Sequence, residues 1–290
     1  MDKNMKPKGL VLSMIFEAES ANYGEGIGNV ASLKKMSRGS GEQYTYISRQ
    51  AMRYNIIEQM GEELAEVSED KKVIQFSPEA TIKEYPEIDL FGYMKTKTGE
   101  GGVTRSAKVR LSNAVSLETF KGDLDFLTNK GLADRLNKNM NIAQSEIHHS
   151  YYRYTITVDL DQIGIDSTDN IYLENKEKSR RINKLLDTIA LLYRDIRGRR
   201  EDLKPLFAIG GVYNIKNPVF QNVIEVKNNV LMIPVIEEVL FDSIKNDTFS
   251  GVVDGKFKNN EEIHEKLGAT NMPEFFNSLK RKVNEYYESN

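Results

Sequence analysis

The chain has 290 residues, of which 39% are hydrophobic and 29% are charged, and it contains no cysteine. This is enough apolar material for a folded protein of one large domain or two, and the lack of cysteine excludes a disulfide framework, a thiolate zinc site and a cysteine nucleophile. The formal net charge is −3, which is not that of a strongly basic nucleic-acid-binding protein.

Charge is unevenly distributed along the first 110 residues. The net charge is +4 over residues 30–53, −6 over residues 61–93 and +4 again over residues 94–110. An acidic block between two basic blocks indicates separate surfaces with separate partners. Ordinary solvated charge is the alternative for each block taken alone.

The first predicted element is a strand over residues 8–18, with apolar residues on both alternating faces. This apolar run is shorter than the ~20 residues of a membrane-spanning helix, and acidic residues follow it where a signal peptide has small ones. We therefore expect a cytoplasmic protein without membrane contact. A long glycine-rich loop runs from about residue 20 to 43, and such loops are typically functional or disordered.

Helical spacing of Ile47, Ala51 and Tyr54 predicts a helix over residues 45–60 that buries the face carrying these three residues. Arg49 and Arg53 lie four residues apart, so this helix presents two guanidinium groups outward.

The next segments are predicted more coarsely. We expect an irregular insertion over 61–104, an extended segment over 105–117 with one basic face, and a mostly helical insertion over 118–149. Two candidate metal ligands, His148 and His149, are adjacent and would face opposite sides of a strand, so they do not predict a metal site.

Residues 151–160 are the clearest strand. Tyr152 and Tyr154 share a face with Ile156 and Val158, which favours core packing over base stacking.

The clearest helix covers residues 176–197 and is predicted to end at Gly198. A strand over 205–213 follows, in which Gly210 and Gly211 indicate strand distortion or a close approach by RNA or a neighbouring subunit. We also expect a strand over 230–236, with Pro234 at an edge or end, and helical segments in the tail, including 273–287.

The order strand, helix, strand, strand, helix, strand predicts an α+β fold with a ferredoxin-like βαββαβ palm, which is also the topology of the RNA recognition motif. The palm comprises residues 1–60, 105–117 and 150–213. Residues 61–104 and 118–149 are insertions, and residues 214–290 form a C-terminal extension packing on the palm.

Several sequence blocks resemble, in the same order, the DevR-type backbone subunit of type I-B CRISPR effector complexes (Cascade), a member of the RAMP superfamily. The blocks are ANYGEGIGN (21–29), LKK (33–35), YTYISRQAMRY (44–54), DLFGYM (89–94), TRSAKVRLSNAVSLE (104–118), GDLDFLTN (122–129), EIHHSYYRYTITVDLDQIG (146–164), LLYRDIRGRRE (191–201) and LFAIGGVY (206–213). The resemblance covers roughly residues 8–220.

This resemblance implies a repeated, non-enzymatic subunit without cofactor or metal that polymerises along a CRISPR guide RNA. Its expected partners are the guide RNA, copies of itself, other Cascade subunits and target DNA paired to the guide, which reads the sequence. Members of the family have a thumb that inserts between guide nucleotides, and the candidates here are residues 94–112 and 212–232.

A holder of single-stranded RNA needs cations along the phosphates and polar groups that do not select a base. Together with the resemblance, this need predicts eleven RNA-binding residues: Asn22, Lys34, Lys35, Arg38, Ser48, Arg49, Gln50, Arg53, Arg105, Lys108 and Arg110. Alternative roles are a solvated basic loop, a helix start at Ser48 and surface ion pairs.

Two other functions remain open. Related type III backbone subunits cut RNA with a loop aspartate, so Asp123 and Asp125 suggest a target RNA endonuclease. The second alternative is an RNA-free regulatory or scaffolding protein.

Overall fold

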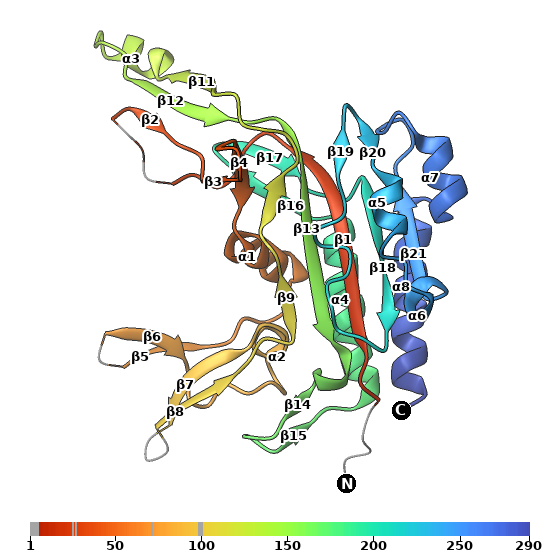
Figure 1. The fold of residues 1–290 in the computed structure, drawn as a ribbon. Coiled ribbons are helices and arrows are strands. Elements are labelled where there is room, and N and C mark those ends of the chain that lie inside the picture. The colour runs from red at the N-terminus through yellow and green to blue at the C-terminus, as the bar shows by residue number, and fades with distance from the viewer. Residues whose placement is uncertain (1–5, 25, 27, 71, 98–100) are drawn as a thin grey trace.

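The computed structural model describes residues 6–24, 26, 28–70, 72–97 and 101–290 and centres on an eight-stranded sheet (Figure 1). Along its main path the strand order is β21–β18–β1–β13–β10–β4–β3, and β9 also pairs with β13. All of these pairings are antiparallel. The strands are β1 (Gly9–Ala18), β3 (Lys35–Ser37), β4 (Gln43–Ile47), β9 (Val109–Leu111), β10 (Ala114–Ser116), β13 (Ser150–Asp159), β18 (Phe207–Tyr213) and β21 (Thr248–Val252).

The chain order of these elements matches the predicted strand and helix order. It runs β1, α1 (Arg49–Met60), β9 and β10, β13, α4 (Asn175–Ala190) and β18. The predicted α+β class is therefore confirmed. Within the sheet, β18, β1 and β13, with β9 and β10 beside β13, lie in the order that a ferredoxin-like palm requires, and β21, β4 and β3 add strands at the two edges.

β1 lies inside the sheet and is buried on both faces, as predicted. Leu10, Leu12 and Met14 belong to one core, whereas Val11 and Ile15 belong to a second core on the opposite face. The period-two geometry of a strand causes this division.

Three helices, α1, α4 and α8 (Met272–Glu288), contribute to the first core. The buried side of α1 is formed by Met52, Ile56 and Met60, and Tyr54, which was expected to be buried, is 62% exposed. The prediction of a helix from residue 45 is also wrong. Residues 43–47 form β4, because aromatic and β-branched residues favour a pleated strand, and α1 begins only after its N-cap Ser48.

The predicted helix over 176–197 is wrong beyond Ala190, where α4 ends. Residues 193–202 form a hairpin of β16 (Tyr193–Ile196) and β17 (Arg199–Asp202). Arg197 and Gly198 have φ of 48° and 77°, and two positive φ values are those of a type I′ hairpin turn. Gly198 is thus a turn residue, and the apolar residues of β16 imitate a continued helical face.

Residues 214–269 contribute most of the second core. Their elements are β19 (Val226–Lys227), β20 (Val230–Leu231), α5 (Ile233–Glu237), α6 (Asp242–Lys245) and α7 (Asn260–Leu267). The predicted strand over 230–236 is wrong beyond Leu231, because Pro234 lies in the first turn of α5, where its missing N–H leaves no helical bond unmade. Phe220, Ile224 and Val226 are buried, so the thumb candidate 212–232 is packed against the sheet.

The insertion over 61–104 is regular, contrary to expectation. It contains β5 (Val67–Asp70), β6 (Val73–Phe76), α2 (Pro86–Phe91) and β7 (Tyr93–Lys97), which pairs with β8 (Gly101–Arg105). The two hairpins project from the sheet (Figure 1), and a small core that includes Ile82, Ile88 and Tyr93 lies at their base. Strands of four or five residues are too short for their alternation to stand out in the sequence.

The insertion over 118–149 is a hairpin rather than mostly helical. β11 (Asp123–Thr128) pairs with β12 (Ile142–Ile147), β2 (Val30–Ala31) adds to β12, and α3 (Lys130–Arg135) lies at the far end (Figure 1). Leu124 and Phe126 alternate with Asp123 and Asp125, which is a strand pattern.

Two short connections complete the fold. A 3₁₀ turn η1 (Leu160–Gln162) follows β13, and β14 (Ile165–Asp166) pairs with β15 (Ile171–Tyr172) before α4. In the described part of the chain, no helix combines the length and apolar character needed to cross a membrane.

Two predictions about palm residues have clear outcomes. Tyr152 and Tyr154 are 0% and 1% exposed, so core packing is confirmed. Gly210 and Gly211 do accommodate a close backbone approach, since an added Cβ would lie 2.1 Å from the Val11 oxygen or 2.0 Å from the Asp247 oxygen. The approaching backbone is therefore the chain's own.

Candidate nucleic-acid interface

The start of α1 is fixed by three polar side chains. Ser48 accepts a hydrogen bond from the Ala51 N–H at 3.3 Å as N-cap, Asn22 accepts from the Ser48 N–H at 2.7 Å, and Asn113 accepts from the Arg49 N–H at 2.9 Å. These bonds satisfy backbone donors that a helix start leaves open. Ser48 and Asn22, both predicted RNA-binding residues, thus have structural roles that set the position of Arg49.

Two hollows adjoin at β9, and we call them together the β9 groove. The first, about 390 Å³, is lined by Arg49, Gln50, Arg53, Phe91, Ala107, Val109, Arg110 and Leu111. The second, about 480 Å³, is lined by Arg49, Arg110, Leu111, Ser112, Asn113, Thr155, Thr157, Asp159, Lys216, Pro218 and Gln221. Arg49, Arg110 and Leu111 line both hollows, so the groove passes from α1 across β9 to β13.

The guanidinium groups of the groove differ in how far they are neutralised. Arg110 donates from Nη1 to Asp159 Oδ2 at 2.8 Å. Arg49 and Arg53 are exposed, and no ion pair joins either of them to a described acidic residue. Arg53 also lies over the Phe91 ring at 6.0 Å. The part of the groove along α1 therefore carries uncompensated positive charge.

Lys216 and the acids beside it complete the other end of the groove. Its Nζ lies 2.6 Å from Asp161 Oδ1 and 3.8 Å from Asp159 Oδ1. Burial alone would raise the pKa of Asp161, but hydrogen bonds from Lys216 and Gln162 lower it below its ordinary value.

Lys108, another predicted RNA-binding residue, lies just before β9. Burial, followed by the positive charge of the neighbouring Arg105, lowers the pKa of Lys108.

Three further predicted cations lie on and beside β3 at the edge of the sheet. Lys35 pairs with Glu146 of β12 at 2.7 Å and lies over the Phe120 ring at 4.4 Å. The Arg38 guanidinium lies over the Tyr44 ring at 4.7 Å, and Lys34 is half-buried. None of these three cations is among the residues that line the β9 groove.

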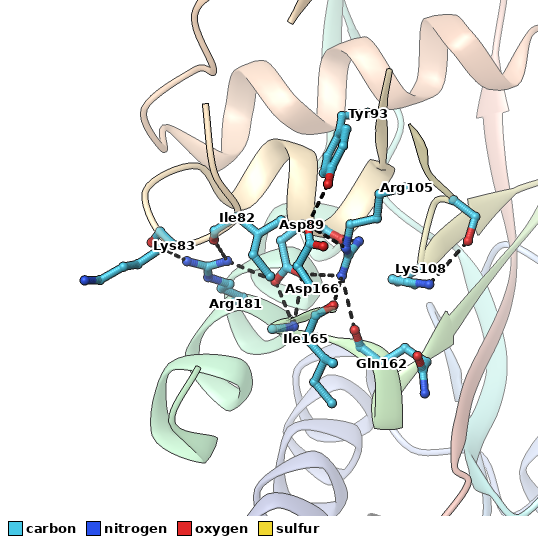
Figure 2. Close-up of polar contacts among 12 residues, drawn as sticks. Ile82, Lys83, Asp89, Tyr93, Arg105, Lys108, Gln162, Ile165, Asp166 and Arg181 are labelled. Atoms are coloured by element: carbon cyan, nitrogen blue, oxygen red, sulfur yellow. Dashed lines mark hydrogen bonds and ion pairs between the residues drawn. The ribbon is translucent and has the colours of Figure 1, made fainter. Parts of the chain in front are cut away.

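Arg105 does not belong to an RNA interface in this structure. It is 8% exposed, and its guanidinium donates to Asp89 Oδ1 at 2.8 Å and to the Gln162 and Ile165 carbonyls at 3.2 Å each (Figure 2). All three acceptors are internal, and we remove Arg105 from the candidate set. The strand-face argument was wrong because β9 begins at Val109, after Arg105.

The groove also contains residues that the sequence did not single out. Lys216 follows β18 as an isolated lysine, without charge pattern or family block around it. Thr157 and Asn113 contribute a hydroxyl and an amide. Only the alternation of β13, which places Thr155 and Thr157 on one face, could have indicated part of this set.

The residues considered for catalysis or metal binding lie apart. Asp123 and Asp125 are exposed on β11. His148 is buried and its Nδ1 is 2.7 Å from Thr45 Oγ1, whereas His149 pairs with Glu17 at 2.9 Å. Across the described ranges, no group of three or more His, Asp or Glu side chains is arranged to hold a metal ion.

Comparisons with known proteins agree with this fold. None of the curated proteins matches the sequence. A solved chain described as "CRISPR RNA-guided surveillance complex, pre-nicking" is similar with a TM-score of 0.59 and 12% identity, over 97% of this chain and 99% of that one. A second, described as "CRISPR RNA-guided surveillance complex", has a TM-score of 0.57 and 14% identity over the same shares. At these identities the likeness shows the fold alone.

The sequence model of one family matches most of the chain. The family is described as CRISPR-associated negative auto-regulator DevR/Csa2, and the match spans residues 10–231, from β1 to β20. The chain therefore belongs to the DevR/Csa2 family of CRISPR-associated proteins.

Proposed function

We propose that this chain is the guide-RNA-binding backbone subunit of a type I-B Cascade surveillance complex. In this role copies of the chain line up along one guide RNA together with other Cascade subunits, and the guide pairs with target DNA in antiviral defence. Base pairing reads the target, so the subunit needs no catalytic residue and no cofactor.

The β9 groove is the observation that carries this proposal. Arg49 and Arg53 offer planar guanidinium groups that suit phosphate oxygens. Gln50 and Thr157 add an amide and a hydroxyl group that can contact ribose or phosphate without selecting a base. Family membership and the fold shared with surveillance-complex chains support the same role.

The near-neutral total charge is compatible with RNA binding because the cations are concentrated locally. The described acids of residues 61–93 lie mainly on the insertion, outside the groove. Nearby charge acts most strongly on RNA phosphates, and no described acid of this segment is among the residues that line the groove.

The test is purification after co-expression with a CRISPR array. We expect the wild-type protein to co-purify with a discrete guide-length RNA and its large assemblies to collapse after RNase treatment. The double variant Arg49→Ala/Arg53→Ala should lose this RNA. In binding titrations with single-stranded RNA, the slope of log affinity against log salt should fall by about 1.4, at ~0.7 per phosphate contact.

A matched control removes two exposed cations elsewhere. Lys266→Ala/Arg281→Ala changes the net charge equally on α7 and α8 and should bind RNA as the wild type does. Equal losses in both double variants would contradict a specific role for the groove.

Two results would replace the proposal with one of its alternatives. A nucleic-acid-free protein in a stable complex with a protein partner would establish the regulatory or scaffolding role. Divalent-dependent cleavage of target RNA that is lost in Asp123→Asn or Asp125→Asn would establish the endonuclease.

A further inference from the structure

Asp89 of α2 is the centre of a buried ionic cluster (Figure 2). The side chain is 0% exposed. Its Oδ1 accepts from Arg105 Nη2 at 2.8 Å, its Oδ2 accepts from Arg181 Nη1 at 2.9 Å, and the Gly164 N–H donates to both oxygens at 2.9 and 3.1 Å. We call Asp89, Arg105 and Arg181 the Asp89 cluster.

The cluster joins four segments of the chain, namely residues 82–89, the end of β8, residues 162–165 and α4. Arg105 ends β8 and reaches the carbonyls of Gln162 and Ile165. Arg181 of α4 donates to the Ile82 and Lys83 carbonyls at 2.7 and 3.1 Å. The insertion is thus tied to the palm through charged groups that are almost fully buried.

A second buried contact supports this junction. The Tyr93 hydroxyl donates to Asp166 Oδ2 at 2.8 Å, and burial, followed by this bond to Asp166, raises the pKa of Tyr93 above its ordinary range.

The residues next to the cluster form a wall of the β9 groove. Phe91, two residues after Asp89, lines the groove and lies beneath the Arg53 guanidinium. The Leu90 carbonyl accepts from the Lys108 N–H at 2.9 Å, which fixes the end of α2 to the segment leading into β9. At Gly92, with φ of 78°, an added Cβ would lie 2.4 Å from the Arg105 oxygen.

Buried ion pairs contribute little net stability, because desolvation offsets their attraction. Their geometric demand is strict, however, since a carboxylate with two guanidinium partners and a backbone donor has few alternative arrangements.

We propose that the Asp89 cluster is the positioning element of the RNA groove: it fixes α2 against β9 so that Arg53 and Arg110 act on the same RNA strand. This inference rests on the proposed function. Asp89 and Arg105 do not touch RNA and act through the placement of Phe91 and the residues before β9.

The test compares Arg105→Lys with a matched variant, Arg194→Lys. Lysine keeps the charge beside Asp89 but lacks the planar fork that also reaches two carbonyls. Arg194 is also buried, with 4% of its surface exposed, and pairs with Glu201 at 2.6 Å, but it lines no part of the β9 groove. We expect Arg105→Lys to lower the affinity for a single-stranded RNA oligonucleotide by roughly five- to tenfold, and Arg194→Lys to leave it within about twofold.

Two readouts separate positioning from a loss of stability. Arg53→Ala should have a smaller effect on RNA affinity in the Arg105→Lys background than in the wild type, and its full effect in the Arg194→Lys background. Hydrogen exchange at the Lys108 N–H should be faster in Arg105→Lys than in the wild type, and unchanged in Arg194→Lys. Arg181→Lys probes the cluster from α4 and replaces Arg105→Lys if that variant does not fold.

The outcomes distinguish this inference from the proposed function. Wild-type binding that depends on Arg49 and Arg53 but is unchanged in the cluster variants overturns the positioning role and leaves the proposed function intact. Equal affinity losses in Arg105→Lys and Arg194→Lys overturn it as well. A wild-type chain that binds no guide RNA overturns both.

Discussion

Asp159 at the end of β13 partly neutralises the β9 groove, so replacing it should strengthen RNA binding. Its Oδ2 accepts from Arg110 at 2.8 Å and its Oδ1 lies 3.8 Å from Lys216 Nζ. Asp159→Asn keeps the shape of the side chain and one accepting oxygen but removes the negative charge. Arg110 then becomes available to a phosphate without competition from a carboxylate.

The size of the effect follows from counterion release. One additional phosphate contact steepens the salt dependence of binding to a single strand by about 0.7 in log affinity per log salt. Between ~1 M and ~0.1 M salt, this difference amounts to about fivefold tighter binding. The Arg110 side chain is 49% exposed, so losing the ion pair should change the free energy of unfolding by only about 0–1 kcal/mol.

The assay is fluorescence anisotropy of a labelled single-stranded RNA across a series of salt concentrations. Asp187→Asn is the control, because Asp187 is an exposed acid on α4 that pairs with Lys280 at 2.8 Å and lies outside the groove. An Asp159→Asn protein with unchanged slope and affinity, or with weaker binding, would refute the reasoning that groove charge limits affinity.

Three other predictions concern stability. Burial lowers the pKa of His148 below its ordinary value of 6.5, so as the pH falls this histidine is protonated in the unfolded chain before it is protonated in the folded one. The free energy of unfolding should therefore decrease below about pH 6.5. Denaturant titrations at several pH values should show that His148→Gln removes this part of the decrease. The Tyr154 hydroxyl is buried without a hydrogen-bond partner in the described structure, so Tyr154→Phe should raise the melting temperature or leave it unchanged. Tyr152→Phe loses hydrogen bonds to Thr45 and to the His148 carbonyl and should lower the free energy of unfolding by about 1 kcal/mol. A larger loss of stability in Tyr154→Phe than in Tyr152→Phe would contradict this assignment. Gly211→Ala places a Cβ 2.0 Å from the Asp247 oxygen and should destabilise the protein by about 1–3 kcal/mol, and a melting temperature equal to the wild type would show that β18 can move away.

The sequence predicted elements whose pattern is long and unambiguous. β1, β13 and β18 alternate over seven to ten residues, and α8 continues for 17 residues. Errors arose where one apolar run crosses a boundary. Leu192 and Tyr193 continue the apolar stripe of α4, and only the positive φ angles at the following turn show that the chain has changed direction.

The candidate site was predictable only in part, because the role of a basic side chain depends on its tertiary partner. Arg105 and Arg110 are five residues apart and look alike in sequence. One is buried against Asp89 and the other lies in the groove. The partner of Arg105 lies 16 residues upstream on α2, and no local pattern reveals this pairing. Lys216 was missed for the same reason.

The β11–β12 hairpin has a consequence for colloidal behaviour. β11 is the outer strand of its three-stranded sheet, and Leu124, Phe126 and Leu127 are all more than half exposed. A free edge with such side chains invites pairing with the same edge of another molecule. Asp123 and Asp125 put two negative charges on that edge, so two copies that approach through β11 meet like charges. We therefore expect the two carboxylates to oppose strand-to-strand aggregation through this edge.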